Sequence, residues 1–368
     1  MHELSATKIP DKLICICVAF LAILSVLMIG STSISTGFFS RSVIVQIVAY
    51  TIGFLLFIPL SKFNYSMLEG SKIKLYIASL ILLLSVYIPG LGVEQFGARS
   101  WINLGVTTVQ PSEIVKILFI LIMAEHISQN RDQMHNIRGV LKSVLVAAPI
   151  ILIVLKEDFG SALVFATVWL TMMFVGGVDG KSIGKFLLAV IALIPIAYIF
   201  MQDYQKSRIA AFLHPENLTL SGNYQVWQSK MAIGSGGFFG KGLFSGEQKE
   251  LEFIPVQTSD FIFSVIGEEL GFIGGEIVLA IFAAMLLRMI KISKNSSSLY
   301  GSLIVAGVVG MFIFQIFENI AMTMGIMPVT GITLPFLSYG GSSIISNMLA
   351  VALVLNIKIY SGETSFHL

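Results

Sequence analysis

Long apolar runs recur along this sequence, and they constrain its fold more than any other feature. They lie near residues 13–30, 43–60, 74–90, 112–127, 140–157, 161–177, 183–201, 260–287, 299–324 and 340–358. A run of roughly 17 to 22 apolar residues can cross a bilayer as a helix, and these runs lack the alternation of a membrane β-barrel. The sequence therefore predicts an all-α polytopic membrane protein with about ten transmembrane helices.

The composition agrees with this interpretation. Only 12% of the residues are charged, whereas 55% are hydrophobic. A soluble domain carries about 25% charged residues, so a large soluble protein is the poorer interpretation. No basic patch interleaved with aromatic residues indicates binding to nucleic acid.

The placement of lysine and arginine predicts the orientation in the membrane. Cytoplasmic loops carry an excess of these residues. In this chain they are concentrated in the short loops on the side that carries the N-terminus. We therefore expect both termini in the cytoplasm. We also expect one transmembrane domain over residues 1–368, with no separate soluble domain and a large extracellular loop over residues 202–259, between predicted helices seven and eight.

Carboxylates lie at the start of one apolar run and inside it, in IPVQTSDFIFSVIGEELGFIGG, residues 254–275. Asp260 opens the predicted helix eight, with Ser259 as a candidate N-cap. Ser264 and Glu268 follow at intervals of four, so they share its helix face. A helix N-terminus favours the ionised carboxylate while apolar burial disfavours it, a balance that suits a general base. The plainer alternative is that Asp260 only caps the helix.

A lysine, Lys116, is placed well inside another apolar run, close to Ser112 and Glu113. One interpretation is a buried Lys116–Glu113 pair that fixes the helix, and the other is a cation directed at an anionic substrate group. Arg99 and Trp101 lie in the outer loop before this helix. Arginine binds phosphate bidentately, whereas a tryptophan here is equally typical of an anchor at the membrane interface.

Two further polar groups have plain and functional interpretations. Asp158 lies in the turn KEDFGSA, which is either a solvated charge run or a wall of a polar cleft. Gln315, Glu318 and Asn319 share one helix face, and hydrogen bonding between helices is the favoured interpretation. Arg99, Lys116, Asp158 and Asp260 together would frame an outward cleft with charges of both signs. Such a cleft suits a lipid-linked anionic substrate that is either moved or made to react.

A glycine run, GSGGFFGKGLFSG, covers residues 234–246. It lacks the Ser or Thr that follows the lysine of a phosphate-binding loop. A flexible loop is the favoured interpretation, with Lys241 and Lys249 near lipid phosphate.

Six blocks of this sequence resemble the SEDS family (shape, elongation, division, sporulation). The blocks are GARSWINLG, QPSEIVK, DFGSA, YQVWQSKMAIGSGGFFGKG, SDFIFSVIGEELGFIG and MPVTGITLPFLSYGGSS, and they follow in order between about residues 90 and 356. The loop text KSRIAAFLHPE and QKELEFIP is most similar to the rod-shape elongation branch, RodA. The division branch, FtsW, and the sporulation branch, SpoVE, are close alternatives.

The resemblance implies a peptidoglycan glycosyltransferase of the bacterial cytoplasmic membrane. It would polymerise lipid II at the outer face for rod-shape wall elongation, with a class B penicillin-binding transpeptidase and the elongation or division machinery as partners. By this resemblance, Asp260 deprotonates the acceptor GlcNAc 4-hydroxyl, which attacks the donor MurNAc C1 with inversion and releases undecaprenyl pyrophosphate. A divalent cation, Mg²⁺ or Mn²⁺, could assist the leaving group.

The candidate residues around this catalytic aspartate fall into two sets. The substrate- and pyrophosphate-binding set is Arg99, Trp101, Lys116, Asp158 and Lys241. The supporting set is Gln110, Ser112, Glu113, Ser259 and Glu268.

The sequence departs from the family pattern at two places. The turn that carries the second aspartate usually opens with glutamine and here reads Lys156-Glu157-Asp158. The catalytic aspartate commonly follows His-Thr and here follows Thr258-Ser259, so no role of that histidine carries over.

Three other functions compete with catalysis. A lipid II flippase would need a continuous hydrophilic path and should tolerate Asp260→Ala. A non-catalytic scaffold for the transpeptidase would be indifferent to Asp260. An ion-coupled transporter predicts paired discontinuous helices in two halves of the chain, and the sequence shows no such pair.

Overall fold

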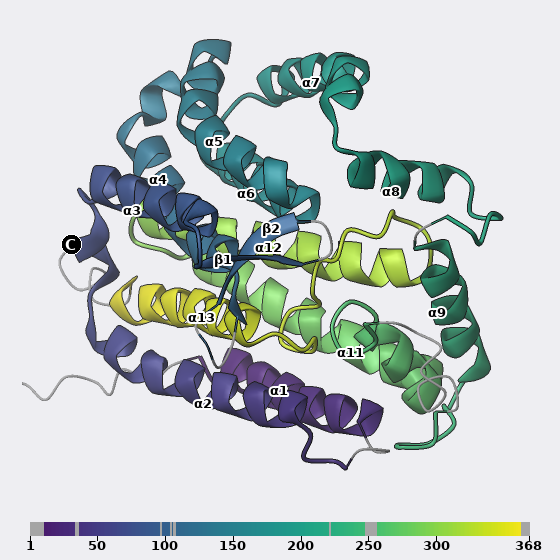
Figure 1. Ribbon diagram of the computed structural model, residues 1–368. Helices are drawn as coiled ribbons and strands as arrows, with labels where there is room; N and C mark the ends of the chain where they lie inside the picture. The colour runs from purple at the N-terminus through teal and green to yellow at the C-terminus, as the bar shows by residue number, and fades with distance from the viewer. Residues whose placement is uncertain are drawn as a thin grey trace, which may run out of the picture.

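The computed structural model describes residues 11–33, 37–95, 98–103, 105, 108–220, 222–246 and 256–361. Helices make up most of it (Figure 1). The first seven are α1 (Lys12–Thr32), α2 (Arg41–Lys62), α3 (Lys72–Leu84), α4 (Pro111–Gln129), α5 (Ile137–Glu157), α6 (Phe159–Val175) and α7 (Gly180–Phe200). They are followed by α8 (Asp203–Leu213), α9 (Asn223–Ser235), α11 (Ile262–Lys294), α12 (Leu299–Thr323) and α13 (Gly341–Ser361).

Short elements connect these helices. Three turns of 3₁₀ helix are η2 (Tyr65–Leu68), η3 (Ser85–Tyr87) and η4 (Arg131–Gln133). A small antiparallel sheet precedes α4 and has the order β1 (Gly92–Gln95), β2 (Ala98–Asn103) and β3 (Thr108–Val109). The large predicted loop at 202–259 is partly helical, since α8 and α9 lie within it.

Every apolar run predicted from the sequence coincides with a helix, which confirms a polytopic helical membrane protein. Within the described ranges, six helices are long and apolar enough to cross a membrane: α1, α2, α5, α11, α12 and α13. The 13 residues of α3 and the 17 of α6 make shorter apolar helices. The number of ten crossings and the cytoplasmic termini stay predictions.

The centre of the bundle is formed by α12 and α13 (Figure 1). Helix α12 packs against α4, α6 and α11, while α13 packs against α2 and α4. Small residues permit the close approach of α12: a Cβ at Gly307 would lie 2.9 Å from Ile120, and one at Gly310 would lie 2.5 Å from Thr171. Such small-residue contacts are typical of helices that pack in membranes.

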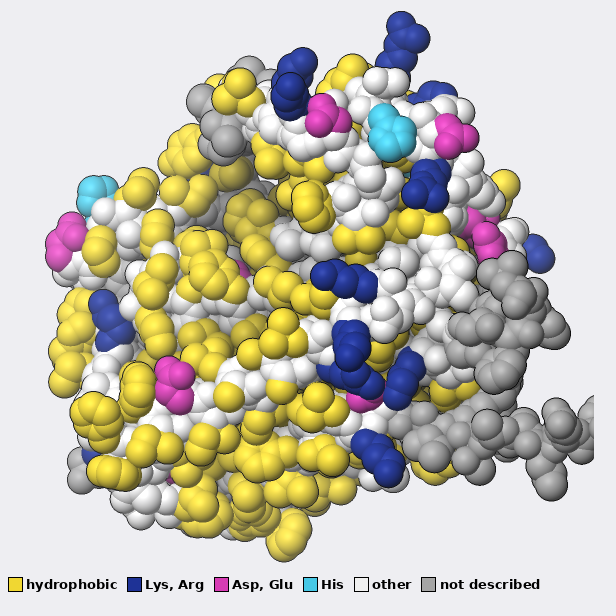
Figure 2. All heavy atoms as spheres, turned by 180° about the vertical axis from the view of Figure 1, so that it is seen from behind, with side chains coloured by type: hydrophobic (Ala, Val, Ile, Leu, Met, Phe, Trp, Pro, Cys, Tyr) yellow, Lys and Arg dark blue, Asp and Glu magenta, His cyan; other side chains and the backbone are white. Residues whose placement is uncertain are grey.

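The outside of the bundle is largely apolar. Figure 2 shows hydrophobic side chains over much of one face, with basic side chains gathered in a few places. Leu55, Ile81 and Leu145 are 60%, 64% and 75% exposed. A soluble protein rarely exposes so much contiguous apolar surface, so this face is suited to lipid.

A break in α11 at Gly271 explains the glycine run. Gly271 has φ 66° and ψ −164°, far from helical values. The amides of Lys241 and Gly242 donate to the carbonyls of Glu268 and Glu269, both at 3.0 Å. A Cβ at Gly240 would lie 2.1 Å from the Glu269 carbonyl oxygen. The interpretation as a flexible loop is therefore wrong for the described part. These glycines allow the loop to approach α11 closely, so that loop amides bond to the helix carbonyls that are left without partners at the break.

Candidate functional site

The turn that carries Asp260 lies immediately before α11. The helix begins at Ile262, and its N-cap is Phe261, without a side-chain hydrogen bond. The prediction of Ser259 as N-cap is therefore wrong: the amides of Ser259 and Asp260 both bond to the Val256 carbonyl, at 3.2 Å, and form a turn instead. The Ser259 hydroxyl donates to Asp260 Oδ1 at 3.0 Å. Asp260 thus stands outside the helix.

The helix face predicted to carry Asp260, Ser264 and Glu268 has only two of these residues. Because Asp260 precedes the helix, only Ser264 and Glu268 remain on it. The Ser264 hydroxyl shares a 2.5 Å hydrogen bond with Ser229 of α9, so this side chain joins α9 to α11.

The backbone around Asp260 is held by α12 and the α12–α13 connection. The side-chain amide of Asn319 donates to the carbonyls of Asp260, at 2.9 Å, and Ile332, at 2.7 Å. The Tyr339 amide donates to the Thr258 carbonyl at 2.8 Å. Residues far apart in sequence therefore fix the position of this carboxylate. The favoured interpretation was hydrogen bonding between helices, whereas Asn319 of α12 bonds to a turn and to a connection that lie outside the helices.

The surroundings shift the ionisation of Asp260. Burial raises the pKa of its carboxyl above the ordinary value of 3.8, while the hydrogen bond from Ser259 and the charge of Arg208 lower it, and the charge of Asp158 raises it. Asp158 and Arg208 are thus near enough to act on Asp260. A carboxylate that is charged but poorly solvated is a better proton acceptor than one in water.

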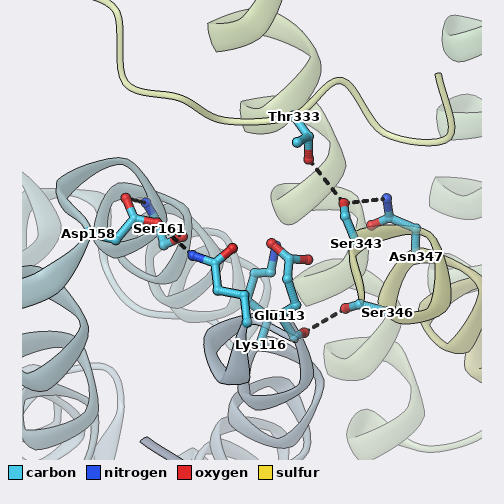
Figure 3. Close-up of polar contacts among 9 residues, drawn as sticks. Glu113, Lys116, Asp158, Ser161, Thr333, Ser343, Ser346 and Asn347 are labelled. Atoms are coloured by element: carbon cyan, nitrogen blue, oxygen red, sulfur yellow. Dashed lines mark hydrogen bonds and ion pairs between the residues drawn. The ribbon is translucent and has the colours of Figure 1, made fainter. Parts of the chain in front are cut away.

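Asp158 is the N-cap of α6 and is not part of a solvated turn. Its Oδ1 accepts from the Ser161 amide at 3.1 Å, and its Oδ2 accepts from the Ser161 hydroxyl at 2.6 Å. The Gln110 side-chain amide donates to the same Oδ2 at 3.0 Å. These contacts join the N-termini of α4 and α6 (Figure 3).

The small sheet positions Arg99 and Trp101. Glu157, at the end of α5, accepts from the Arg99 amide at 3.0 Å and from the Tyr87 hydroxyl. Within the described part of the chain, the Arg99 guanidinium makes no ion pair. Trp101 faces Val93 across the sheet and is partly buried. The fold therefore places Arg99 beside the Glu157–Asp158 turn.

The Lys116–Glu113 pair predicted as the plainer interpretation is present. Lys116 Nζ lies 2.8 Å from Glu113 Oε1, and the two side chains are 1% and 8% exposed. The Ser346 hydroxyl of α13 donates to the Glu113 carbonyl at 2.6 Å. Lys116 is thus a cation whose charge is already balanced by a neighbour.

Polar atoms converge around this pair (Figure 3). Thr333 and Ser343 share a 3.0 Å hydrogen bond, and Asn347 follows one turn along α13. Ser112 Oγ, Glu113 Oε2 and Asn347 Oδ1 are buried, and none of them has a hydrogen-bond partner among the described residues. Buried polar atoms are nearly always paired, so this cluster can accept hydrogen bonds from water or from a ligand.

Lys241 and Glu268 pair with each other, at 3.0 Å, beside the break in α11. Glu268 lies about 9 Å along the helix from its first residue, given 1.5 Å per residue. The structure therefore does not bring this pair to Asp260. Lys249 lies outside the described residues.

The residues present do not form a ready metal site. Among the described residues there is no group of three or more His, Cys, Asp or Glu side chains that could hold an ion. Both oxygens of Asp158 already accept hydrogen bonds. Magnesium at phosphate-binding sites is commonly held by one or two carboxylates together with the phosphates of the substrate. Binding of such an ion here would therefore require substrate phosphates as ligands.

Two nearby residues had no assigned role in the sequence analysis. Arg208 of α8 donates to the Thr330 carbonyl at 2.8 Å, and its guanidinium lies over the ring of Tyr204, at 5.6 Å. The Thr330 hydroxyl donates to Glu318, whose Oε2 is buried and has no partner in the part of the chain that the structure describes. Arg208 was visible in the block KSRIAAFLHPE, but only the fold shows what it faces.

Comparison with known proteins gives consistent matches. The family described as Cell cycle protein (FtsW/RodA/SpoVE) matches residues 11–363. Peptidoglycan glycosyltransferase MrdB of Escherichia coli (strain K12) is 35% identical over 309 residues, which cover 84% of this chain and 83% of that protein. Stage V sporulation protein E of Bacillus subtilis (strain 168) is 37% identical over 295 residues, 79% of each chain.

A solved structure also superposes on nearly the whole chain. It is described as showing the structural coordination of polymerization and crosslinking by a peptidoglycan synthase complex. The TM-score is 0.82 at 29% identity, and the match covers 97% of this chain and 99% of that one.

Proposed function

The chain belongs to the FtsW/RodA/SpoVE family of cell cycle proteins, and we propose that it polymerises lipid II into the glycan strands of peptidoglycan. It is a peptidoglycan glycosyltransferase, the activity for which its relative MrdB is named. It is also a multi-pass protein of the bacterial inner membrane. The observation that carries the finer proposal is the Asp260 carboxyl, whose backbone Asn319 holds and whose pKa the charge of Arg208 lowers against the effect of burial.

In the proposed reaction Asp260 is the general base. The acceptor GlcNAc 4-hydroxyl gives its proton to the Asp260 carboxylate while its oxygen bonds to C1 of the donor MurNAc. The bond between C1 and the phosphate oxygen breaks, and its electron pair leaves with undecaprenyl pyrophosphate. Attack from the face opposite the leaving group inverts the configuration at C1.

The geometry of the turn suits this role. A base works best when its position is fixed before the substrate arrives, and Asn319 and Ser259 hold the backbone and one oxygen of Asp260. The other oxygen, Oδ2, lies beside Gly331, where an added Cβ would be 3.6 Å away. A glycine there leaves room for a sugar hydroxyl.

The remaining site residues are proposed to position the two substrates. Arg99 is suited to an anionic group, because no described carboxylate pairs with its guanidinium. Trp101 offers an aromatic face beside it. The Gln110–Asp158 contact and the Glu113–Lys116 pair would order the wall opposite α11. A Mg²⁺ or Mn²⁺ ion would enter with the pyrophosphate and neutralise its charge.

The cellular setting is part of the proposal. We place the site at the outer face of the membrane, with both termini in the cytoplasm, as the lysine and arginine distribution predicts. A class B penicillin-binding transpeptidase is the proposed partner, supported by the similarity to a structure of a synthase complex that couples polymerization to crosslinking. Rod-shape elongation is the proposed process, with division or sporulation as alternatives.

A polymerisation assay tests the function. The purified chain, together with its transpeptidase, should convert labelled lipid II into long glycan strands. Translocation of lipid II across vesicles without any strand formation would support a flippase instead. An active transpeptidase partner mixed with an inactive preparation of this chain is the matched control, because it shows whether the partner itself makes the strands.

A further inference from the structure

A pocket lies between α8, α9 and the α12–α13 connection. Figure 1 shows α8 and α9 adjoining the end of α12. The pocket opens to solvent, and its space measures about 510 Å³ when the solvent-open part is counted. Two of its lining residues are cations, Arg208 and Lys230, and none of the described residues that line it is acidic. Its apolar walls include Phe212, Val226, Trp227 and Val329.

Glycines in the chain make this pocket possible. Gly325 has φ +73°, and a Cβ there would lie 3.0 Å from Val226 and 3.6 Å from Lys230 Nζ. Gly222 has φ +96° and approaches Val329, 3.6 Å from its hypothetical Cβ. Larger residues at either place would narrow the gap between α9 and the connection. The cationic end of the pocket therefore depends on these backbone positions.

The two cations differ in how they are held. Arg208 is fixed by its hydrogen bond to the Thr330 carbonyl and by the Tyr204 ring, so part of its planar guanidinium stays available to a ligand. Lys230 is exposed and makes no ion pair or hydrogen bond with a described residue. Phosphate oxygens are the natural ligands for one guanidinium and one ammonium held together.

The pocket is next to the catalytic turn. Arg208 lines it, bonds to Thr330 and acts on the charge of Asp260. The cation Lys116, by contrast, is balanced by Glu113 at 2.8 Å. Negative charge that grows during the reaction is stabilised best by cations that are not already balanced. In the proposed reaction this growing negative charge appears on the pyrophosphate leaving group.

We infer that this pocket binds the pyrophosphate of the donor lipid, with Arg208 and Lys230 on its phosphates and the first prenyl units against Phe212 and Trp227. Phe212 and Trp227 are 40% and 43% exposed, so they offer an apolar surface that a soluble ligand would not need. This inference rests on the proposed function and assigns the donor to this pocket and the acceptor to the Glu113–Lys116 cluster. The acceptor then approaches from the Glu113–Lys116 side.

Binding of farnesyl pyrophosphate tests the pocket without requiring turnover. The whole chain is placed in phosphatidylcholine nanodiscs and titrated calorimetrically. Lys230→Gln should weaken binding about fivefold, the upper range for one exposed charge contact, and Lys230→Glu should weaken it further. Lys230→Arg should bind as the wild type does. Lys206→Gln, which removes a charge from α8 outside the pocket, is the matched control and should bind within twofold.

Titrations with other ligands show whether the phosphates, the prenyl chain or a membrane lipid accounts for the binding. Inorganic pyrophosphate and farnesol should each bind more weakly than farnesyl pyrophosphate, because each uses one part of the pocket. Phosphatidylglycerol added to the nanodiscs should not compete. Unchanged binding by Lys230→Gln, pyrophosphate binding as tightly as the prenylated form, or full competition by phosphatidylglycerol would each overturn the inference.

The Asp260→Asn variant keeps this test distinct from the proposed function. It should bind farnesyl pyrophosphate as the wild type does and yet form no strands. If it forms strands, the proposed function fails whatever the pocket binds. If it is inactive while Lys230→Gln still binds normally, the function stands and the pocket assignment fails.

Discussion

Asn319 joins the turn that carries Asp260 to the α12–α13 connection: its side-chain amide donates to the carbonyls of Asp260, at 2.9 Å, and Ile332, at 2.7 Å. Asn319 is fully buried, so both carbonyls depend on it for a partner. The position of Asp260, the proposed base, is thus set by the backbone and by α12, independently of the charge of the carboxylate. This arrangement links stability and activity at one residue.

Asn319→Ala should therefore lower both the stability of the protein and its polymerisation rate. Leaving a buried acceptor without a donor costs about 1–3 kcal/mol, and a loosened turn misplaces the base. We expect a lower melting temperature and a clearly lower polymerisation rate. Asn130→Ala, which removes a 2.8 Å amide bond to the His126 carbonyl far from Asp260, should leave the rate unchanged. Equal rates for the two variants would contradict the role of Asn319.

The buried pair of Glu113 and Lys116 should show strong coupling. Removing one partner of a buried pair costs about 3–5 kcal/mol because the other charge stays unpaired. Lys116→Met and Glu113→Leu should each destabilise the protein by that amount, and the double variant should lose less than the sum. Thermal unfolding of the four proteins in one detergent measures the coupling. Additive losses would mean that the two charges do not depend on each other.

The break in α11 predicts a sharp difference between two glycines. Gly240 and Gly237 have φ of +78° and +55°, so alanine is strained at both. At Gly240 a Cβ would also lie 2.1 Å from the Glu269 carbonyl oxygen, whereas at Gly237 nothing lies within 4 Å. Gly237→Ala should cost about 1–2 kcal/mol, and Gly240→Ala should cost clearly more. Similar melting temperatures for both variants would disprove the close backbone contact.

The pH dependence of activity should report on Asp260. Only the ionised carboxylate accepts a proton, so the rate falls as pH drops through its pKa. Burial raises that pKa above 3.8, and the hydrogen bond from Ser259 lowers it. Ser259→Ala removes this bond and should move the acid limb of the kcat/KM profile to higher pH. A limb that stays in place or moves to lower pH would contradict Asp260 as the titrating base.

Helix locations were largely predictable from the sequence. An apolar run that is surrounded by lipid or protein must satisfy its backbone hydrogen bonds internally, and a helix does so. All ten runs coincide with helices. The buried Lys116–Glu113 pair followed from spacing, since residues three apart share a helix face. The role of Asp260 came from the family resemblance and stays a prediction.

Local geometry at the site was less predictable. Ser259 could cap a helix by its residue type, but the turn at Val256 shifts the start of α11 to Ile262. The ion pair between Lys241 and Glu268 was not predicted, and the expected contact of Lys241 with substrate stays a prediction. These outcomes depend on contacts between segments distant in sequence, and local patterns do not encode them. Arg208 was missed for the same reason, because its partner Thr330 lies 122 residues away.

The rate of lipid II polymerisation by Asp260→Asn, beside the wild type and with the same transpeptidase, tests the central claim most directly. Asparagine keeps the size of the side chain but cannot accept the proton. The rate should fall by a factor of about 10²–10⁴, which is what a general base typically contributes. The melting profile should not change. Polymerisation at the wild-type rate by the folded variant would contradict the account.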